Sequence, residues 1–124
     1  MRTLTTSVVA ISSEFASNRA HYEGLVADLQ KHLALARAGG SPELVALHRQ
    51  RGKLTARERI AKLLDPDVPW LELSPLAASG MYDNQISAAG LITAIGYVSG
   101  RPCVIAANDA TVKGGTYFPM TTAI

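Results

Sequence analysis

Residues 91–108 read LITAIGYVSGRPCVIAAN, and this stretch decides the fold class. Two apolar runs rich in strand-forming residues, 91–98 and 103–108, flank the turn-forming segment 99–102, which predicts a β-hairpin. Apolar residues fill nearly every position of both runs, so we expect both faces of these strands to be buried, as in a sheet covered by helices. A third, short strand is expected at residues 70–73.

Three helices are expected before the hairpin. The first runs from Ser13, its expected N-cap, to the Gly39-Gly40 pair, because glycine adopts the left-handed conformation that ends helices. The second begins at Pro42, since proline costs little at the first helical position. The third begins with the capping-box spacing Thr55–Glu58 and ends at Asp65, before a proline. The apolar stripe of the first helix consists of Tyr22, Val26, Leu29, Leu33 and Ala36.

The composition is that of one globular domain. The chain has 124 residues, of which 48% are hydrophobic and 18% charged, which excludes a disordered tail or a low-complexity segment. The net charge of +2 is too balanced to indicate nucleic-acid or membrane binding by itself. The single cysteine, Cys103, excludes an internal disulfide. No apolar run approaches the roughly 20 residues of a membrane span, so we expect a cytoplasmic protein.

These elements predict a mixed α/β (α+β) fold, with helices first and a β-hairpin region after them. Residues 1–12 are expected to form an N-terminal arm, and residues 13–124 a single incomplete domain. A sheet that is buried on both faces needs covering layers, whereas all the predicted helices precede the strands. The chain is therefore expected to be the opening part of something larger.

The strongest charge feature is the segment 49–62, which contains six of the twelve basic residues and one acidic residue, Glu58. Arginine forks fit phosphate groups, so the segment could bind nucleic acid or a phosphorylated cofactor. The absence of interleaved aromatic residues argues against stacking on single strands. The alternative is a solvated helix face with local ion pairs to Glu58 or Asp65. The basic residues are Arg49, Arg51, Lys53, Arg57, Arg59 and Lys62.

The second candidate is the segment Lys113-Gly114-Gly115-Thr116. Paired glycines let backbone N–H groups approach a ligand closely, as an anion nest or an oxyanion hole; the alternative is an ordinary turn. The lysine precedes the glycines, so the segment is not a Walker motif. The three histidines are scattered through the helical part without metal-binding spacing. We identify no catalytic residue and no metal ligand in the chain.

Three blocks of sequence occur in a recognisable order. They are RGKLTARERI at 51–60 with LLDP at 63–66, LELSPLA at 71–77 with MYD at 81–83, and ANDATVKGGTY at 107–117 with Pro119 and Met120. Together they resemble the carboxyltransferase (β) subunit of biotin-dependent acyl-CoA carboxylases. The third block is similar to the methylcrotonoyl-CoA carboxylase branch and its geranyl-CoA relative rather than to the propionyl-CoA branch.

The resemblance implies a crotonase-like (ClpP/crotonase) fold, of which this chain would be the N-terminal part. It implies carboxyl transfer from carboxybiotin to an acyl-CoA, here 3-methylcrotonoyl-CoA, a step of leucine degradation. Biotin would be carried by a partner α subunit in a hetero-oligomer with other β subunits, and this chain would bind no cofactor itself. Backbone N–H donors would hold the enolate of the acyl-CoA, and no metal is required for this half-reaction.

The resemblance also places an acyl-CoA site on this chain. CoA carries a diphosphate and a 3′-phosphate, for which arginine and lysine are suitable partners. The expected acyl-CoA-binding residues are Arg51, Lys53, Arg57, Arg59, Lys113, Gly114 and Gly115. A structural role for Arg57 and Arg59 in ion pairs is the alternative.

The chain departs from the family in a few places. Thr121-Thr122-Ala123-Ile124 stands where the family continues into a Val-Lys-Lys helix, Tyr97 stands where arginine is frequent, and Ala89 and Ala94 stand where glycines are common. We therefore expect an N-terminal fragment that is inactive alone. The alternatives are a geranyl-CoA or other acyl-CoA carboxylase β subunit, a non-catalytic module that binds phosphate or nucleic acid through residues 49–62, and a decayed product without a stable fold. The resemblance argues against nucleic acid as a partner.

Overall fold

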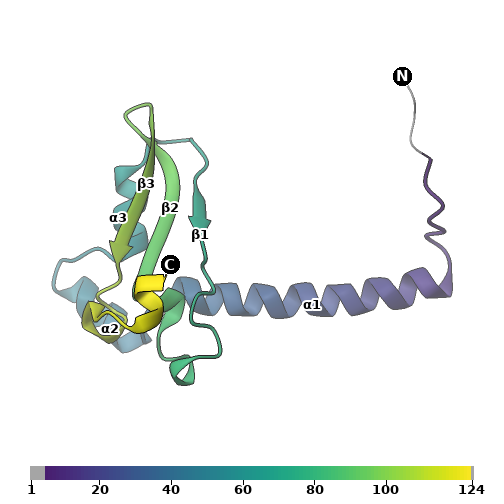
Figure 1. Cartoon of the computed structure of the whole chain (residues 1–124), viewed down its shortest axis with the longest axis horizontal. Helices are drawn as coiled ribbons and strands as arrows, with labels where there is room; N and C mark the ends of the chain where they lie inside the picture. The colour runs from purple at the N-terminus through teal and green to yellow at the C-terminus, as the bar shows by residue number, and fades with distance from the viewer. Residues whose placement is uncertain (1–4, 124) are drawn as a thin grey trace. The chain divides into compact units, whose positions relative to one another are not determined.

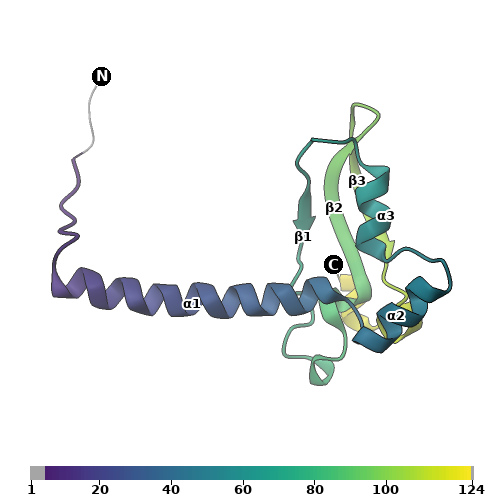
Figure 2. The same cartoon turned by 180° about the vertical axis from the view of Figure 1, so that it is seen from behind.

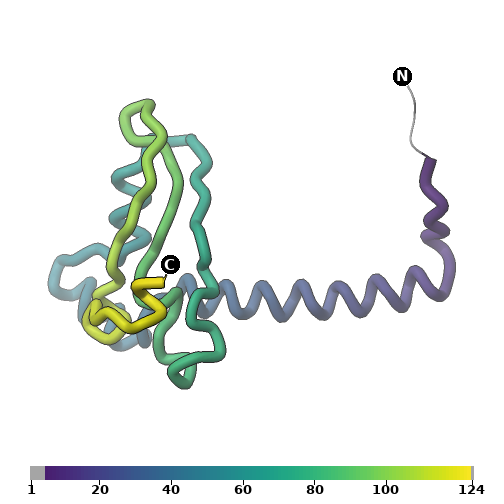
Figure 3. Tube along the Cα trace, in the orientation of Figure 1, coloured from purple at the N-terminus to yellow at the C-terminus, as the bar shows by residue number. Residues whose placement is uncertain are grey.

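The computed structural model describes residues 5–123 and shows a mixed α/β fold, as the sequence predicts (Figure 1). Three helices precede three strands, and the tube in Figure 3 traces the same path. The helices are α1 (Ser13–Ala38), α2 (Pro42–Gln50) and α3 (Ala56–Leu63), the strands β1 (Leu71–Leu73), β2 (Leu91–Val98) and β3 (Arg101–Asn108), and the short 3₁₀ segments η1 (Tyr82–Asn84), η2 (Ser87–Gly90), η3 (Lys113–Gly115) and η4 (Pro119–Ala123).

The chain divides into two compact units, residues 1–32 and 33–124. Most of α1 lies in the first unit, where the side chains of its predicted stripe are exposed from Tyr22 to Leu29. The predicted N-cap is wrong by one residue: the hydroxyl of Ser12, not that of Ser13, accepts a hydrogen bond from the amide of Phe15 at 3.1 Å. Adjacent serines offer the same capping group, so local sequence alone does not choose between them.

The second unit begins with the end of α1 and continues into two short helices that start as predicted. Ser41 caps α2, with Pro42 at its first position. Thr55 and Glu58 form the capping box of α3: the Thr55 amide donates to Glu58 Oε2 at 2.7 Å, and the Glu58 amide donates to Thr55 Oγ1 at 3.4 Å. Both starts depend on contacts within four residues, which is why the sequence predicts them.

The three strands form an antiparallel sheet in the order β1-β2-β3, and the predicted hairpin of β2 and β3 is confirmed. Strand β3 begins at Arg101, two residues earlier than predicted, and includes Pro102. A proline is tolerated there because β3 is an edge strand of this sheet and Pro102 has no N–H to donate. Asp65, just beyond α3, accepts hydrogen bonds from the turn amides of Ser99 and Gly100 at 2.6 and 2.7 Å.

The core lies between α3 and one face of the sheet (Figure 1). Ile60 of α3 and Leu64, the residue directly after the helix, pack with the buried side chains of that face. Gly96 of β2 allows the close approach, because a Cβ there would lie 2.5 Å from Leu64 Cδ2. The buried residues of the cluster are Ala56, Ile60, Leu64, Ala88, Ile92, Ala94 and Ile105.

The other face of the sheet is open to solvent, so the expectation of two buried faces is wrong for the described chain. Leu71, Ile95 and Val104 are directly opposite one another across the three strands, and they are 59%, 42% and 77% exposed. Figure 2, seen from behind, shows α3 beside β2 and β3. Apolar residues on both faces make a strand suitable for burial, but within residues 33–123 only one face receives a helix.

Candidate functional site

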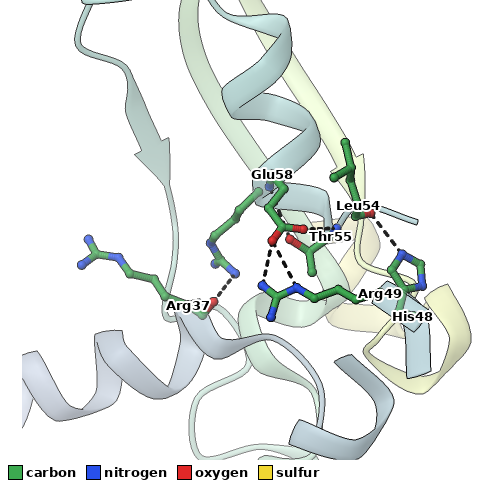
Figure 4. Close-up of polar contacts among 7 residues, drawn as sticks. Arg37, His48, Arg49, Leu54, Thr55 and Glu58 are labelled. Atoms are coloured by element: carbon green, nitrogen blue, oxygen red, sulfur yellow. Dashed lines mark hydrogen bonds and ion pairs between the residues drawn. The ribbon is translucent and has the colours of Figure 1, made fainter. Parts of the chain in front are cut away.

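Two of the six basic residues predicted in segment 49–62, Arg49 and Arg57, form ion pairs. Arg49 donates two hydrogen bonds to Glu58 Oε1, from Nη2 at 2.7 Å and from Nε at 3.2 Å (Figure 4). The Thr55 amide and Arg49 together lower the pKa of Glu58 from 4.5 to about 2, with the backbone hydrogen bond as the largest cause. The sequence indicates Glu58 as an ion-pair partner, and the structure identifies Arg49 as the arginine involved.

Arg57 forms a second, more sheltered pair. Its Nη2 donates to Glu72 Oε1 at 2.6 Å and its Nε to Glu72 Oε2 at 3.3 Å. Its Nη1 donates to the carbonyl of Arg37 at 3.3 Å. The two side chains of the pair are 17% and 11% exposed. Arg57 therefore connects α3 with β1 and with the end of α1, and its partner is Glu72 rather than the predicted Glu58 or Asp65.

The remaining basic residues of the acyl-CoA prediction lie on the surface. Arg51, Lys53 and Arg59 are exposed, and their side chains form no hydrogen bond or ion pair with any residue that the structure describes. Arg51 and Lys53 belong to an ordered connection, since His48 Nε2 donates to the carbonyl of Leu54 at 3.1 Å (Figure 4). These three cations are therefore available to an anionic ligand.

Lys113, Gly114 and Gly115 form a turn of left-handed residues, with φ of 47°, 70° and 81°. The amides of Gly115 and Thr116 close the turn on the carbonyls of Val112 and Lys113, at 2.9 and 3.3 Å. The amides of Lys113 and Gly114 form no hydrogen bond within residues 5–123, so two adjacent N–H groups remain available to an acceptor. Consecutive N–H groups in such a conformation are typical of an anion-binding nest.

Side chains that the sequence did not single out position this turn. Lys113 Nζ donates to Gln85 Oε1 at 2.5 Å, and Asn108 Nδ2 donates to the carbonyl of Gly115 at 3.5 Å. Tyr117 Oη in turn donates to Asn108 Oδ1 at 3.0 Å. The sequence signal for Asn108 is its position at the end of a predicted strand, shortly before the glycine pair, whereas nothing in the sequence near Gln85 indicates its contact with Lys113.

The two halves of the predicted site are not joined in the described residues. No hydrogen bond, ion pair or pocket there connects Arg51, Lys53 or Arg59 with Lys113. A polar cavity of about 60 Å³ lies nearby, but it is far smaller than the several hundred Å³ of a ligand pocket. Its lining residues are Arg37, Ala38, Gly39, Val45, Arg49, Thr55, Arg57, Asp109 and Thr111.

The described residues contain neither a metal centre nor a membrane-spanning helix. Within residues 5–123, no three His, Cys, Asp or Glu side chains lie close enough together to hold a metal ion. None of the helices in that range is long and apolar enough to cross a membrane.

Comparisons with known proteins identify the family. Residues 47–123 match the carboxyl transferase domain family. The chain is 55% identical over 118 residues to the biotin-dependent 3-methylcrotonyl-coenzyme A carboxylase beta1 subunit of Mycobacterium tuberculosis. The matched region covers 95% of this chain and 22% of that relative. It is 47% identical over 110 residues to the mitochondrial methylcrotonoyl-CoA carboxylase beta chain of Arabidopsis thaliana, and this match covers 89% of this chain and 19% of that relative.

Comparison with solved structures supports the same family. The beta subunit of geranyl-CoA carboxylase from P. aeruginosa matches over 98% of this chain and 23% of its own, with a TM-score of 0.72 and 33% identity. The transcarboxylase 12S core, described as a hexamer with methylmalonyl-coenzyme A bound, matches over 82% of this chain and 21% of its own, with a TM-score of 0.71 and 33% identity. This chain thus spans about a fifth of the length of these relatives. It belongs to the carboxyl transferase family, whose members are the carboxyltransferase subunits of biotin-dependent acyl-CoA carboxylases.

Proposed function

We propose that this chain forms the first part of the N-terminal, crotonase-like domain of a carboxyltransferase β subunit whose substrate is 3-methylcrotonoyl-CoA. The observation that carries the proposal is the extent of sequence identity and coverage with relatives of different substrate specificity. Methylcrotonoyl-CoA carboxylase chains are 43–55% identical over 89–95% of this chain, whereas two propionyl-CoA carboxylase chains are 43% and 35% identical over only 64% and 74% of it. Geranyl-CoA is the alternative substrate, because a geranyl-CoA carboxylase subunit shares the fold.

The role proposed for the chain is to hold the acyl-CoA. Arg51, Lys53 and Arg59 are exposed cations, suited to the CoA phosphates. Lys113 and the adjacent amides of the Lys113–Gly115 turn form a second group of donors, suited to an anionic oxygen of the ligand. Arg57 belongs to the same basic segment of the sequence, but its guanidinium is already engaged by Glu72, so we propose that it holds α3 and β1 in place.

The reaction itself requires more than these residues. Biotin on a partner α subunit would supply the carboxyl group, in a hetero-oligomer that contains further β subunits. This chain's own contribution is to bind and orient the thioester, with no side chain acting as acid, base or nucleophile. We therefore propose that the 124-residue chain does not catalyse carboxylation alone.

The test is a calorimetric titration of the chain with 3-methylcrotonoyl-CoA. Binding should weaken in Arg51→Ala and in Lys113→Ala, and remain unchanged in Lys31→Ala, an exposed lysine of α1 that serves as the matched control. The pantetheine thioester, which lacks the nucleotide phosphates, should bind more weakly than the full CoA ester.

Two results would contradict this function. One is that the Lys113→Ala variant binds the CoA ester with the same affinity as the unchanged chain. The other is a higher affinity for DNA or RNA than for the CoA ester, with a steep dependence on salt concentration, which would favour a nucleic-acid-binding module in residues 49–62.

A further inference from the structure

The loop before the Lys113–Gly115 turn contains a buried polar network. Asp109 and Thr111 are each 3% exposed. Asp109 Oδ1 accepts hydrogen bonds from the amide of Thr111 at 2.9 Å and from its hydroxyl at 2.5 Å. The amide of Val112 donates to the carbonyl of Asp109 at 3.0 Å. The carboxylate therefore fixes both the side chain and the backbone of residues 109–112.

The same hydroxyl reaches a segment 71 residues away in sequence. Thr111 Oγ1 accepts a hydrogen bond from the amide of Gly40 at 3.0 Å, at the junction between α1 and α2. Thr111 is thus acceptor and donor in one chain of bonds from an amide to a carboxylate, an order in which neighbouring hydrogen bonds strengthen each other. A serine could make both bonds, and a valine neither.

The junction has no room for a side chain. A Cβ at Gly40 would collide with the carbonyl oxygen of Thr111, and a Cβ at Gly39 would lie 2.9 Å from Asp109 Oδ2. The backbone of the junction therefore rests directly on the loop. This contact explains the Gly39-Gly40 pair more fully than helix termination does, since Gly39 alone has the positive φ that ends a helix.

The fixed loop leads directly into the candidate acyl-CoA turn. Val112, the residue after Thr111, is buried, and its carbonyl accepts the hydrogen bond from the Gly115 amide that closes the turn. At the far side, Asn108 holds the carbonyl of Gly115. The turn is therefore anchored through Thr111 and Val112 at its start and through Asn108 at its end.

We propose that Thr111 is a positioning residue for acyl-CoA binding: by joining Gly40 to Asp109 it fixes the loop that presents the free amides of Lys113 and Gly114 to the ligand. This proposal rests on the proposed function of that turn. Its physical basis is preorganisation, because donors that are already held in their binding geometry lose less conformational freedom when a ligand arrives. Thr111 itself does not touch the ligand.

The test uses three single substitutions in the 124-residue chain. Thr111→Val removes both hydrogen bonds at nearly constant shape, and Thr111→Ser retains both. Leu64→Ala loosens the apolar cluster beside α3, which includes none of residues 109–115, and so controls for general destabilisation. Two quantities are measured. One is the Kd for 3-methylcrotonoyl-CoA, and the other is hydrogen exchange at the amide of Gly40, which donates to Thr111, and at the amides of Gly115 and Thr116, which close the turn.

In Thr111→Val we expect both the Kd and the exchange rates of the Gly115 and Thr116 amides to rise by at least about tenfold, because two side-chain hydrogen bonds are lost together. Thr111→Ser and Leu64→Ala should remain close to the unchanged chain in both. The proposal is overturned if faster exchange in Thr111→Val is confined to Gly40, if Leu64→Ala reproduces the effect, or if serine fails to rescue it. If the unchanged chain does not bind the CoA ester, the proposed function fails, and the exchange rates alone decide whether Thr111 positions the turn.

Discussion

Arg57 and Glu72 lie 15 residues apart in sequence and form a two-bonded ion pair that is largely sheltered from water. The pair is the polar counterpart of the apolar contact between α3 and the sheet. The family resemblance assigns the Arg57 guanidinium to acyl-CoA, but Glu72 already accepts its hydrogen bonds. Arg57 therefore has a structural role that the exposed cations of the same segment do not share.

The Arg57–Glu72 pair should contribute measurably to stability. Arg57→Ala leaves the Glu72 carboxylate without its partner, and we expect a loss of about 2 kcal/mol, less than for a fully buried pair because both side chains retain some contact with water. Arg49→Ala, which breaks an exposed pair, should cost less than about 1 kcal/mol. Urea denaturation measures both. Equal losses in the two variants would contradict the assignment of Arg57 to the scaffold.

Glu58 should make stability depend on pH in the acid range. Its pKa is lowered from 4.5 to about 2 in the folded chain, so its contribution is present above pH 4.5 and is lost as the pH falls towards 2. In Glu58→Gln, which preserves the capping box, urea midpoints should fall less steeply between pH 5 and 2. Parallel curves for the two proteins would show that Glu58 is not the group responsible.

Replacing Ala89 by glycine should stabilise the folded chain. It is buried with a φ of 51°, a conformation that is costly for any residue with a Cβ. Ala89→Gly should therefore raise the free energy of unfolding by about 0.5–1 kcal/mol. Ala94→Gly is the matched control, since Ala94 is equally buried but lies in β2 without a positive φ, and it should lose about 1 kcal/mol. A loss in both variants would mean that the strain at Ala89 is negligible.

The open face of the sheet should make the isolated chain associate. Leu71, Ile95 and Val104 form an uncharged row across three strands, and an exposed apolar surface of this kind favours self-association. Val104→Lys should lower the average mass measured by light scattering, whereas Val8→Lys, at an exposed valine outside the sheet, should not. A monomeric unchanged chain with a cooperative melt would contradict this expectation.

The isolated chain should not carboxylate 3-methylcrotonoyl-CoA. Incorporation of labelled bicarbonate should remain at background even when an intact α subunit is added, because the chain spans about a fifth of the relatives that it matches. The full-length relative of Mycobacterium tuberculosis is the positive control. Incorporation above background by the pure chain would refute the expectation.

The sequence predicted what local contacts determine. The starts of α2 and α3 depend on Ser41 and on the Thr55–Glu58 box, and the hairpin depends on its own turn, so each was identified without tertiary information. The N-cap of α1 was displaced by one residue because Ser12 and Ser13 are chemically equivalent.

The candidate site was predicted less completely because its contacts join distant segments. Nothing near Arg57 in sequence points to Glu72, and nothing near Gly40 points to Thr111, which is 71 residues away. The exposure of Val104 was missed for a related reason: apolar residues suit a covered strand, but their pattern does not indicate whether the cover belongs to the same stretch of chain.

The contact of Asp65 with the hairpin turn has a consequence for the cooperativity of unfolding. Its carboxylate holds the amides of Ser99 and Gly100, and Asp65 directly follows the last turn of α3. The hairpin can form by itself within microseconds, but its turn gains these two bonds only once α3 has formed and docked. Helix and hairpin therefore stabilise each other, so the segment from Thr55 to Asn108 should unfold as one cooperative unit.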